Sequence, residues 1–459
     1  NGRLAAELEG YTTGYQLVAV NTDALRRLRT GTLTMAVHCR QTSGGQFIDV
    51  GLIDQQEVVK PPARGPVTSP TSDLRAPAIP LVVCDPYFSV WSSTDRLFDD
   101  WPVHWTGTTQ ALTGMIRVDG KTYRFLGNPV REKGEVADVE QLSVDVQPTR
   151  TLYRFLAGPV ELQLTFATPM LPADLEVLAL PVTYLQYTVE SRDEADHEVA
   201  LYFDATAELA VNKPDQLVEW GRMVVPGDHP LIAMRVGTEE QPILEKDGDN
   251  LRIDWGHFYV AAPDARGVST VIADDTSARE AFATQRALPM EDDKRMPRAA
   301  NDHWPVLACT FELGKVGKAS QTRHLILAYD DLYCIEYLGN KLRPYWRRDG
   351  ADSRDLLKLA ADQYLDLMKR CADFDRQLMA DLEKVGGPAY AQLCAMAYRQ
   401  AIGAHKLAAG PKNEPMMFSK ECFSTGCIAT VDVAYPASPV FMLLSNELLK
   451  ATVRPVLDY

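Results

Sequence analysis

The sequence predicts a multidomain β + α protein, in which antiparallel sheets packed as a large β-sandwich are followed by antiparallel helical hairpins. Three observations lead to this fold class. The chain has 459 residues, a length that usually corresponds to roughly three domains. Strand-like runs recur from residue 80 to about 345 without long helices between them. After about residue 350 the apolar residues change to helical spacing.

The first 55 residues read as β-structure. Residues 15–20 and 32–39 are β-rich runs, and residues 46–52 alternate into a last strand. This segment is too small to bury a full core. Residues 56–79 are expected to be a linker, because several prolines remove backbone donors and favour extended chain.

Residues 80–348 are expected to form the sandwich. Asp119-Gly120 lies between two alternating runs, which is a strong signal for a β-hairpin. Many strands without long helices between them favour antiparallel sheets. The predicted strands are Ile79–Val83, Gly114–Val118, Thr122–Leu126, Gln141–Val146, Val160–Ala167, Val182–Val189, Glu198–Phe203, Leu231–Val236, Phe258–Ala261, Val306–Phe311 and His324–Ala328.

Residues 350–459 are expected to be helical. A first helix runs from about 355 to 382, with Asp352 or Ser353 as its N-cap, and Gly386-Gly387 ends it. A second helix opens at Pro388 and extends past His405 until Gly410-Pro411. Two helices joined by such a turn form an antiparallel hairpin. A third helix is expected from about Ser438 to Leu457. Because the chain lacks an initiator Met and stops after a helical pattern, we expect an internal fragment.

Composition excludes several classes of function. The net charge of −15 and the pI near 5.1 argue against a nucleic-acid binder and against docking on anionic membranes. The apolar runs are too short to span a bilayer. No phosphate loop, dinucleotide motif or metalloprotease motif is present. We therefore expect a small-molecule substrate, no cofactor and no metal. The eight cysteines are scattered, which favours buried thiols, although a Cys422–Cys427 disulfide stays open.

Residues 84–107, CDPYFSVWSSTDRLFDDWPVHWTG, combine three tryptophans with several aspartates. Indoles beside carboxylates provide a stacking face and directional acceptors for a polar ligand. The alternative is an aromatic corner that closes a sheet, with aspartates capping turns. The candidate substrate-binding residues in this stretch are Asp99, Trp101, His104 and Trp105.

Residues 416–443, MMFSKECFSTGCIATVDVAYPASPVFML, place charged groups in an apolar, glycine-containing loop. Glu421, Asp432 and Lys420 are the candidate catalytic residues, because two carboxylates and a lysine suit general acid–base hydrolysis. Tyr435 is a further candidate for substrate binding. The alternative is a structural Lys420–Glu421 ion pair, with Asp432 capping a turn.

Together the two stretches resemble the glutaminase A family of fungi and bacteria. The similarity runs from about residue 76 to 459 and includes APAIPLVVCDPYFSVWS, PVTYLQYTVESRD, LYFDATAELAVN and FSKECFSTGCIATVDVAYPASPVFM. The resemblance implies a β-rich region before a six-helical-hairpin (α/α)6 toroid, which would be truncated here. It also implies export, so that the protein is secreted or periplasmic. Separately, LRTGTLTMAVHCRQTSGGQFIDVGL resembles the closing strands of jelly-roll domains that accompany glycoside hydrolases, which makes residues 1–55 the remnant of a jelly-roll β-sandwich.

The resemblance implies a hydrolase that releases ammonia from glutamine, incomplete in this fragment. Glu421 or Asp432 would then act as the base, and Lys420 would hold a substrate carboxylate or the oxyanion. A glycoside hydrolase is the alternative enzyme, since such toroids also occur in glycosidases and a fold does not determine chemistry. A carbohydrate-binding module without catalysis is a third reading.

Overall fold

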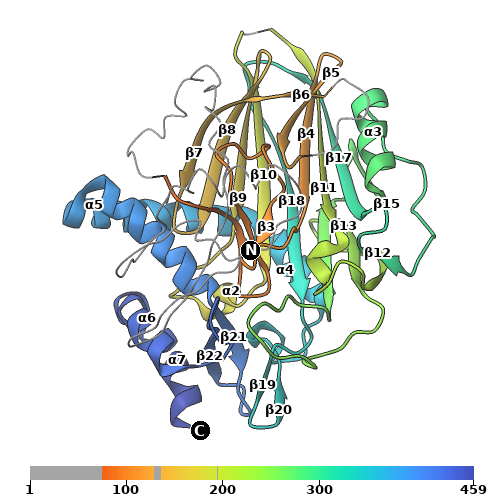
Figure 1. Cartoon of the computed structure of the whole chain (residues 1–459). Helices are drawn as coiled ribbons and strands as arrows, with labels where there is room; N and C mark the ends of the chain where they lie inside the picture. Colours follow the sequence, from red (N-terminus) through yellow and green to blue (C-terminus); the bar gives the residue numbers. More distant parts are fainter. Residues whose placement is uncertain (1–74, 129–135, 194, 459) are drawn as a thin grey trace, which may run out of the picture. The chain divides into compact units, whose positions relative to one another are not determined.

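The computed structural model describes residues 75–128, 136–193 and 195–458 (Figure 1). The chain divides into two compact units, Asn1–Pro66 and Val67–Tyr459, and every described residue belongs to the second. The jelly-roll remnant expected at 1–55 lies outside the described residues, as does the linker expected at 56–79 apart from its last five residues.

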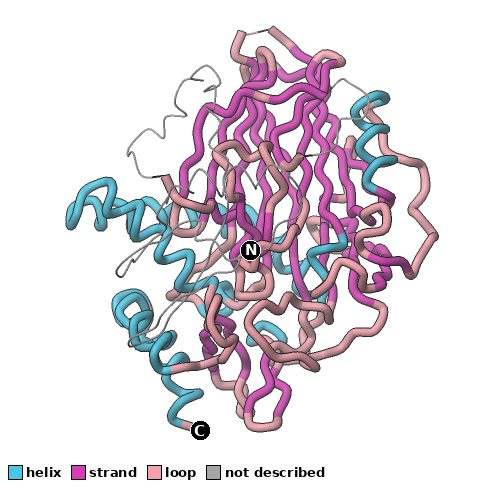
Figure 2. The backbone as a smooth tube through the Cα atoms, in the orientation of Figure 1, coloured by secondary structure: helices cyan, strands magenta, loops and turns pink. Residues whose placement is uncertain are grey.

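Two large sheets dominate the described part of the chain, as the magenta strands of Figure 2 show. The nine-stranded sheet has the order β16-β12-β13-β14-β18-β10-β9-β8-β7, and the six-stranded sheet has the order β15-β17-β11-β4-β5-β6. Neighbouring strands are antiparallel except for the parallel pair β5 and β6. The nine strands are β7 (Glu140–Val146), β8 (Arg150–Ala157), β9 (Val160–Ala167), β10 (Val182–Ser191), β12 (Leu217–Val225), β13 (Leu231–Thr238), β14 (His257–Pro263), β16 (Arg298–Ala299) and β18 (Gln321–Asp330). The six strands are β4 (Leu112–Val118), β5 (Lys121–Leu126), β6 (Val136–Asp138), β11 (His197–Thr206), β15 (Val268–Asp274) and β17 (Pro305–Val316).

Three small sheets and several helices complete the described elements. The small sheets are β1 (Ile79–Val83), β2 (Ser89–Ser92) and β3 (Val103–His104), then β19 (Ile335–Tyr337) and β20 (Asn340–Leu342), then β21 (His405–Ala409) and β22 (Pro415–Ser419). The helices are α2 (Leu175–Leu178), α3 (Asp275–Gln285), α4 (Ser353–Asp362), α5 (Tyr364–Gly403), α6 (Val431–Leu444) and α7 (Asn446–Leu457), with 3-10 turns η1 (Ala207–Ala210) and η2 (Tyr345–Arg347). No helix of the described residues has the length and apolarity needed to cross a bilayer.

The strand predictions that fall on described residues are confirmed. Each of the runs predicted between Ile79 and Ala328 lies within a strand, and Ile79–Val83 and Val160–Ala167 match to the residue. The Asp-Gly hairpin also forms: Val118 pairs with Lys121, and Asp119 and Gly120 have φ of 47° and 87°. Positive φ at both central residues is what a tight hairpin turn requires, and glycine adopts it without steric cost.

One apolar core joins the two large sheets. Leu162 of β9 and Phe203 of β11 belong to the same buried cluster. Aromatic rings cross from sheet to sheet, because Tyr187 of β10 lies 6.1 Å from both Phe125 of β5 and Phe311 of β17. Such ring pairs add packing energy to the area that they bury. The two sheets therefore face each other across this core.

Helices cover the other face of each sheet. On the nine-stranded sheet, Tyr184 and Ile326 pack against Leu356 and Leu357 of α4. The Tyr184 hydroxyl donates to the carbonyl of Ala360 at 2.8 Å. On the six-stranded sheet, Phe282 of α3 packs into a separate cluster, and Figure 1 shows α3 beside β15. A sheet buried on both faces explains why so many strand residues are apolar.

The predicted helical hairpin is confirmed. Inside α5, Gly387 has φ 80° and ψ 179°, which interrupts the helix just before Pro388. The rings of Phe374 and Tyr398 lie 5.7 Å apart, whereas 24 residues of straight helix would separate them by about 36 Å. The two halves of α5 therefore fold back on each other. Asp352 caps α4 in a capping box with Asp355, and a break at Gln363 separates α4 from α5.

The predicted end of the second helix is wrong. The helix stops at Gly403, and His405–Ala409 instead forms β21, which pairs with β22. Gly403 lies so close to β1 that an added Cβ would come within 2.2 Å of Val83 Cγ1. All five residues of β21 are buried. A short apolar run of this kind has no periodicity that separates a helix from a buried strand.

The predicted third helix and the predicted loop before it also need correction. Two helices, α6 and α7, replace the single helix, because Ser445 is extended and its hydroxyl accepts a hydrogen bond from the backbone N–H of Leu448. The loop ends earlier than expected, since α6 already begins at Val431. Pro436 and Pro439 lie inside α6, although proline usually marks a helix start or break.

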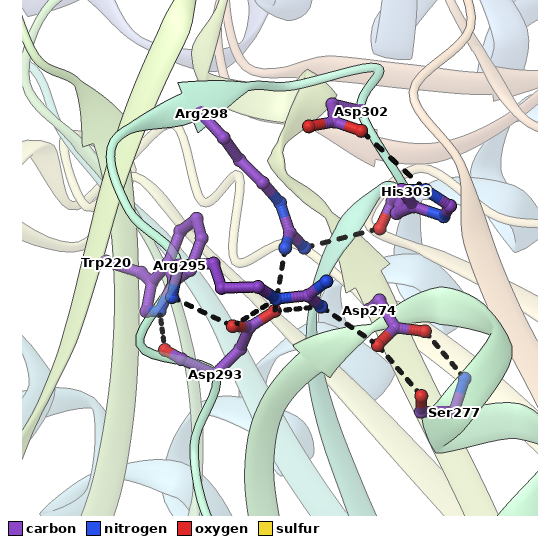
Figure 3. A network of polar contacts seen from close by, with 8 residues as sticks. All are labelled: Trp220, Asp274, Ser277, Asp293, Arg295, Arg298, Asp302 and His303. Carbon is purple, nitrogen blue, oxygen red and sulfur yellow. Dashed lines mark hydrogen bonds and ion pairs between the residues drawn. The ribbon is translucent and has the colours of Figure 1, made fainter.

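A polar network fastens the long connection between α3 and β17 to the edge of the nine-stranded sheet (Figure 3). Asp293 accepts hydrogen bonds at 2.7 Å from Arg298 Nη1 and Arg295 Nη2. Its backbone carbonyl accepts from Trp220 Nε1 at 2.8 Å. The hydrogen bonds from Arg295 and Arg298 outweigh partial burial and hold the pKa of Asp293 below its ordinary value.

We expect Asp293→Asn to lower the free energy of unfolding by about 2 kcal/mol, because it removes the charge opposite the buried Arg298. A carboxylate with a lowered pKa stabilises the fold fully above its unfolded pKa, near pH 4. That stability is lost progressively as the pH falls below about 4 towards the lower pKa of the folded state. Urea unfolding at pH 7 and pH 3 measures the difference, which should shrink at pH 3.

The matched control is Glu291→Gln, whose ion pair with Lys294 is largely exposed and should contribute less than about 0.5 kcal/mol. Equal effects of the two substitutions, or no pH dependence for Asp293→Asn, would contradict the role of this network.

Candidate functional site

Three segments meet at the candidate site: residues 85–107, the loop 245–256 and the loop 420–428. The ring of Trp105 lies 5.2 Å from Phe423 in an edge-to-face contact. The Lys420 ammonium donates to the carbonyls of Gly248 at 2.9 Å and Gly426 at 3.4 Å. These contacts join stretches that are more than 140 residues apart in the sequence.

The two loops approach so closely that one glycine is required. Gly426 has φ 74°, and an added Cβ would lie 2.2 Å from the carbonyl oxygen of Gly248. Both the backbone conformation and the lack of space therefore exclude a side chain here. The bridge between Lys420 and Ile428 closes the base of the same loop.

A buried ion triad lies beneath this site. Lys406 Nζ of β21 is 2.6 Å from Asp85 Oδ2 and 2.7 Å from Asp331 Oδ2. All three side chains are at most 8% exposed. They line a small pocket together with Tyr87, Phe88, Ile253 and Tyr329. Buried charges of this kind persist only when they are paired and hydrogen-bonded.

The pKa values of the two aspartates in the triad are shifted in opposite directions. Burial raises the pKa of Asp331, and the nearby Asp85 adds to this, so that the pKa stays raised despite Lys406. Burial opposes the charged form of Asp85 as well, but Lys406 and two backbone N–H groups outweigh it and lower the pKa. Burial would lower the pKa of Lys406, yet the two aspartates raise it well above its ordinary value. Lys406 is therefore a fixed cation.

Asp85 also shapes the turn that carries the site. Its Oδ1 accepts hydrogen bonds from the backbone N–H groups of Tyr87 at 2.8 Å and Phe88 at 3.0 Å. This turn exposes the carbonyl of Pro86 to two rings: His104 Nε2 lies 3.0 Å away and Trp105 Nε1 donates at 2.7 Å. The triad thereby fixes the two aromatic rings through one carbonyl group.

The environment of His104 determines its protonation. A carbonyl only accepts, so Nε2 carries the hydrogen, and Nδ1 accepts from the Thr106 backbone N–H and hydroxyl. Burial, to which the nearby cations Arg252 and Lys420 add, lowers the pKa of His104 to about 3. The imidazole is neutral at physiological pH, and both nitrogens are occupied. His104 is fully buried and therefore positions its neighbours in this structure.

The predicted catalytic residues are divided between two places. Lys420 is buried, and burial lowers its pKa. Glu421 follows it in the loop and accepts a hydrogen bond of 2.5 Å from Thr425 Oγ1, which lowers the pKa of Glu421. The ion pair between Lys420 and Glu421, which was the alternative to catalytic roles, is not among the ion pairs of the described residues. Asp432 is exposed in the first turn of α6, where the sequence predicted a loop.

The predicted substrate-binding residues are also divided. His104 and Trp105 lie at the site. Trp101 instead packs edge-to-face on Trp304 at 5.2 Å, and Asp99 forms an ion pair with Arg96. Tyr435 is 79% exposed on α6. The contact between Trp105 and Phe423 nevertheless brings the two sequence stretches together.

Sequence reasoning missed Lys406, Asp331 and Arg252. Lys406 stands in the buried strand HKLAA, and Asp331 follows the apolar run HLILAYD. A charged residue within or directly after a buried strand needs a partner of opposite charge. This pattern could have identified Lys406 and Asp331 from the sequence. Its partner was not predictable, because Asp85 is 321 residues from Lys406.

Cys422 is half-buried and Cys427 is exposed, and both are free thiols in the structure. Among the described residues, no three histidine, cysteine or acidic side chains are grouped closely enough to hold a metal ion.

Three family models match the chain. A domain of unknown function, DUF4964, matches residues 64–133, and another, DUF5127, matches residues 149–381. The glutaminase A six helical-hairpin domain matches residues 387–459. The three models follow one another along the sequence.

Two curated fungal proteins are similar to the chain. Glutaminase A of Aspergillus oryzae is 30% identical over 401 residues, which are 84% of this chain and 56% of that protein. A probable glutaminase of Arthroderma benhamiae is 25% identical over 429 residues, which are 84% of this chain and 47% of that protein. The chain thus spans about half the length of the curated relatives it matches.

Solved structures resemble it more distantly. A putative kojibiose phosphorylase from the human microbiome aligns with 65% of this chain and 32% of its own, at 12% identity and a TM-score of 0.31. A galactose mutarotase related enzyme from Lactobacillus acidophilus aligns with 56% of this chain and 96% of its own, at 8% identity and a TM-score of 0.23.

We expect Lys406→Met to lower the free energy of unfolding by about 3–5 kcal/mol at pH 7, because two carboxylates then remain buried without their cation. Urea unfolding measures this loss. Adding Asp331→Asn to Lys406→Met should restore part of the stability, since one of the uncompensated charges is removed.

Lys369→Met is the matched control, because Lys369 also forms a 2.6 Å ion pair, with Asp373, but lies exposed on α5. That substitution should change stability by less than about 0.5 kcal/mol. A loss for Lys406→Met no larger than the control's would disprove the structural role of the triad.

Proposed function

The chain belongs to the glutaminase A family, and on that basis we propose that the whole protein is a hydrolase that releases ammonia from the side-chain amide of glutamine. The similarity to glutaminase A over 84% of the chain carries this proposal. The arrangement of the site supports it, because the loop 420–428 carries the cation Lys420, the carboxylate of Glu421 and the ring of Phe423, which contacts Trp105.

Hydrolysis of an amide needs a base that activates water and a positive group that stabilises the oxyanion. We assign the base to Glu421 or Asp432. The hydrogen bond from Thr425 favours the ionised form of Glu421, which is the form that accepts a proton from water. The proton would then pass to the departing ammonia as the carbon–nitrogen bond breaks.

We assign Lys420 to the oxyanion or to a carboxylate of the substrate. Two of its three N–H groups donate to the carbonyls of Gly248 and Gly426, which leaves one donor for a ligand. Trp105 and the exposed Phe423 would contact the apolar part of the substrate. His104 would act by positioning Trp105. Asp99, Trp101 and Tyr435 remain proposed substrate-binding residues outside this cluster.

Several finer features belong to the same proposal. We propose that residues 80–348 form a β-sandwich domain and that residues 350–459 form the truncated part of a six-hairpin toroid. The apposed sheets with their common core and the α5 hairpin support these assignments. For residues 1–55 we retain the jelly-roll remnant, and for 56–79 the linker. The family supports a secreted or periplasmic location and a small-molecule substrate.

A second candidate function is carbohydrate hydrolysis or binding. Phe423 is 71% exposed and meets the ring of Trp105, and exposed aromatic rings are suitable surfaces for sugar rings. Ammonia release from L-glutamine and reducing-sugar release from a panel of glycans separate the two functions in one set of assays. Sugar release without ammonia would overturn the glutaminase proposal.

We expect Asp432→Asn in the full-length protein to abolish ammonia release while leaving the melting temperature nearly unchanged, because the side chain is exposed. Glu421→Gln should reduce the rate by about 10²–10⁴-fold if Glu421 is the base instead. Initial rates and thermal denaturation are measured on both variants.

Glu447→Gln serves as the control, since Glu447 is an exposed acid in the first turn of α7 just as Asp432 is in α6. Full activity in both Asp432→Asn and Glu421→Gln would refute the assignment of the base. A large fall in melting temperature for Asp432→Asn would instead indicate a structural role.

A further inference from the structure

Two cations at the candidate site have no acidic partner. Within the described part of the chain, neither Arg252 nor Lys420 forms an ion pair with a carboxylate, whereas buried arginines such as Arg279 and Arg298 do. Arg252 Nη1 donates only to the Asn250 carbonyl at 3.3 Å and to Thr106 Oγ1 at 3.5 Å. A half-buried guanidinium that binds only neutral oxygens retains donors and charge for an anion.

We propose that Arg252 and Lys420 form a carboxylate-binding subsite, and that Arg252 is the residue that contacts the α-carboxylate of an amino-acid substrate. This inference rests on the proposed function, because it specifies how glutamine would be held. It also selects one of the two roles proposed above for Lys420, because the Lys420 ammonium would then bind the substrate carboxylate and not stabilise the oxyanion.

Hydrogen bonds anchor the two cations to one loop. The Gly248 carbonyl accepts from Lys420 and the Asn250 carbonyl accepts from Arg252, so that two residues of one loop separate their anchors. Thr106, which accepts from Arg252, also bonds His104 Nδ1 at 3.0 Å. The loop 245–256, which contains both of these carbonyls, therefore lies beside the rings of His104 and Trp105.

The charges nearby do not neutralise the pair. Asp254 favours the charged form of Arg252, but its ion pair is with Lys246 and it also accepts a hydrogen bond from Gln216 Nε2. Asp249 is close enough to Lys420 to favour its charged form, but it forms no ion pair with it, and its Oδ1 is buried without a hydrogen-bond partner. Burial lowers the pKa of Arg252 and of Lys420, which is the cost of keeping a cation unpaired. A ligand carboxylate would remove that cost.

The surroundings define the chemical class of the ligand. Trp105 and Phe423 supply an apolar surface beside the cations. A molecule with a carboxylate on a short aliphatic stem satisfies both, whereas a neutral sugar would leave the two charges unpaired. A planar guanidinium binds a carboxylate through two parallel hydrogen bonds, which adds directional selectivity.

The test compares two ligands that differ only in the α-carboxylate: L-glutamine and 4-aminobutanamide. Binding to the 459-residue chain is followed by calorimetry or by NMR titration. Wild type should bind L-glutamine at least ~10-fold more tightly, because a charge-assisted pair is lost with the analogue. In Arg252→Gln this preference should fall to within about twofold, while binding of 4-aminobutanamide stays unchanged.

Two further variants secure the result. Arg252→Lys keeps the charge but not the paired donors, so its preference should lie between wild type and Arg252→Gln. Arg323→Gln is the matched control, because Arg323 on β18 is also an arginine without an ion pair among the described residues, and it donates to the backbone carbonyl of Thr322. Its preference should equal that of wild type. Thermal denaturation checks that each variant is folded.

A preference for L-glutamine that survives Arg252→Gln, or no binding of L-glutamine to wild type, would overturn the subsite. Loss of the preference in Arg252→Gln, together with no ammonia release by the full-length protein, would leave the subsite standing and reject glutaminase activity. Ammonia release with an unchanged preference would reject the subsite alone.

Discussion

The buried ion triad of Lys406, Asp85 and Asp331 is the interaction on which the rest of the site depends. Each member comes from a different part of the chain: Asp85 follows β1, Asp331 follows β18, and Lys406 lies in β21. Transfer of three charges from water costs several kcal/mol per ion, and only their mutual attraction offsets this. The triad therefore forms only when all three segments are in place, and it requires the C-terminal strands to be attached to the sheets.

Hydrogen bonds connect the triad to the rings of the candidate site. Asp85 fixes the turn at Pro86, and the Pro86 carbonyl orients the rings of His104 and Trp105. Trp105 then meets the loop of Lys420 at Phe423. Because both the ring of Trp105 and the loop of Lys420 are held in place, their side chains have little conformational freedom, as a preorganised site requires. The proposed catalytic residues of the loop 420–428 are thus distinct from the triad that orients the rings of His104 and Trp105.

The sequence predicts the local elements well and the long-range ones poorly. Alternating and apolar runs identify strands such as Val160–Ala167, because a strand buried on one or both faces imposes that pattern. Gly387 and Pro388 likewise predict the hairpin turn. The strand at His405–Ala409 was not predictable, because its buried residues lack any period, and neither was a helix that contains Pro436. Part of the candidate site could be predicted from the sequence, because Trp105 and Lys420 lie in stretches with an unusual composition. The partners of Lys406 could not be predicted from its neighbours in the sequence, and the loop that contains Arg252 has no recognisable motif.

Hydrogen–deuterium exchange of Lys406→Met against wild type tests the central claim most directly. If the triad holds the site, the backbone amides of residues 86–107 and 420–428 should exchange at least ~10-fold faster in the variant, although residues 86–107 are about 300 positions away in the sequence. Faster exchange confined to β21 and β22, with both of those segments as protected as in wild type, would contradict the account.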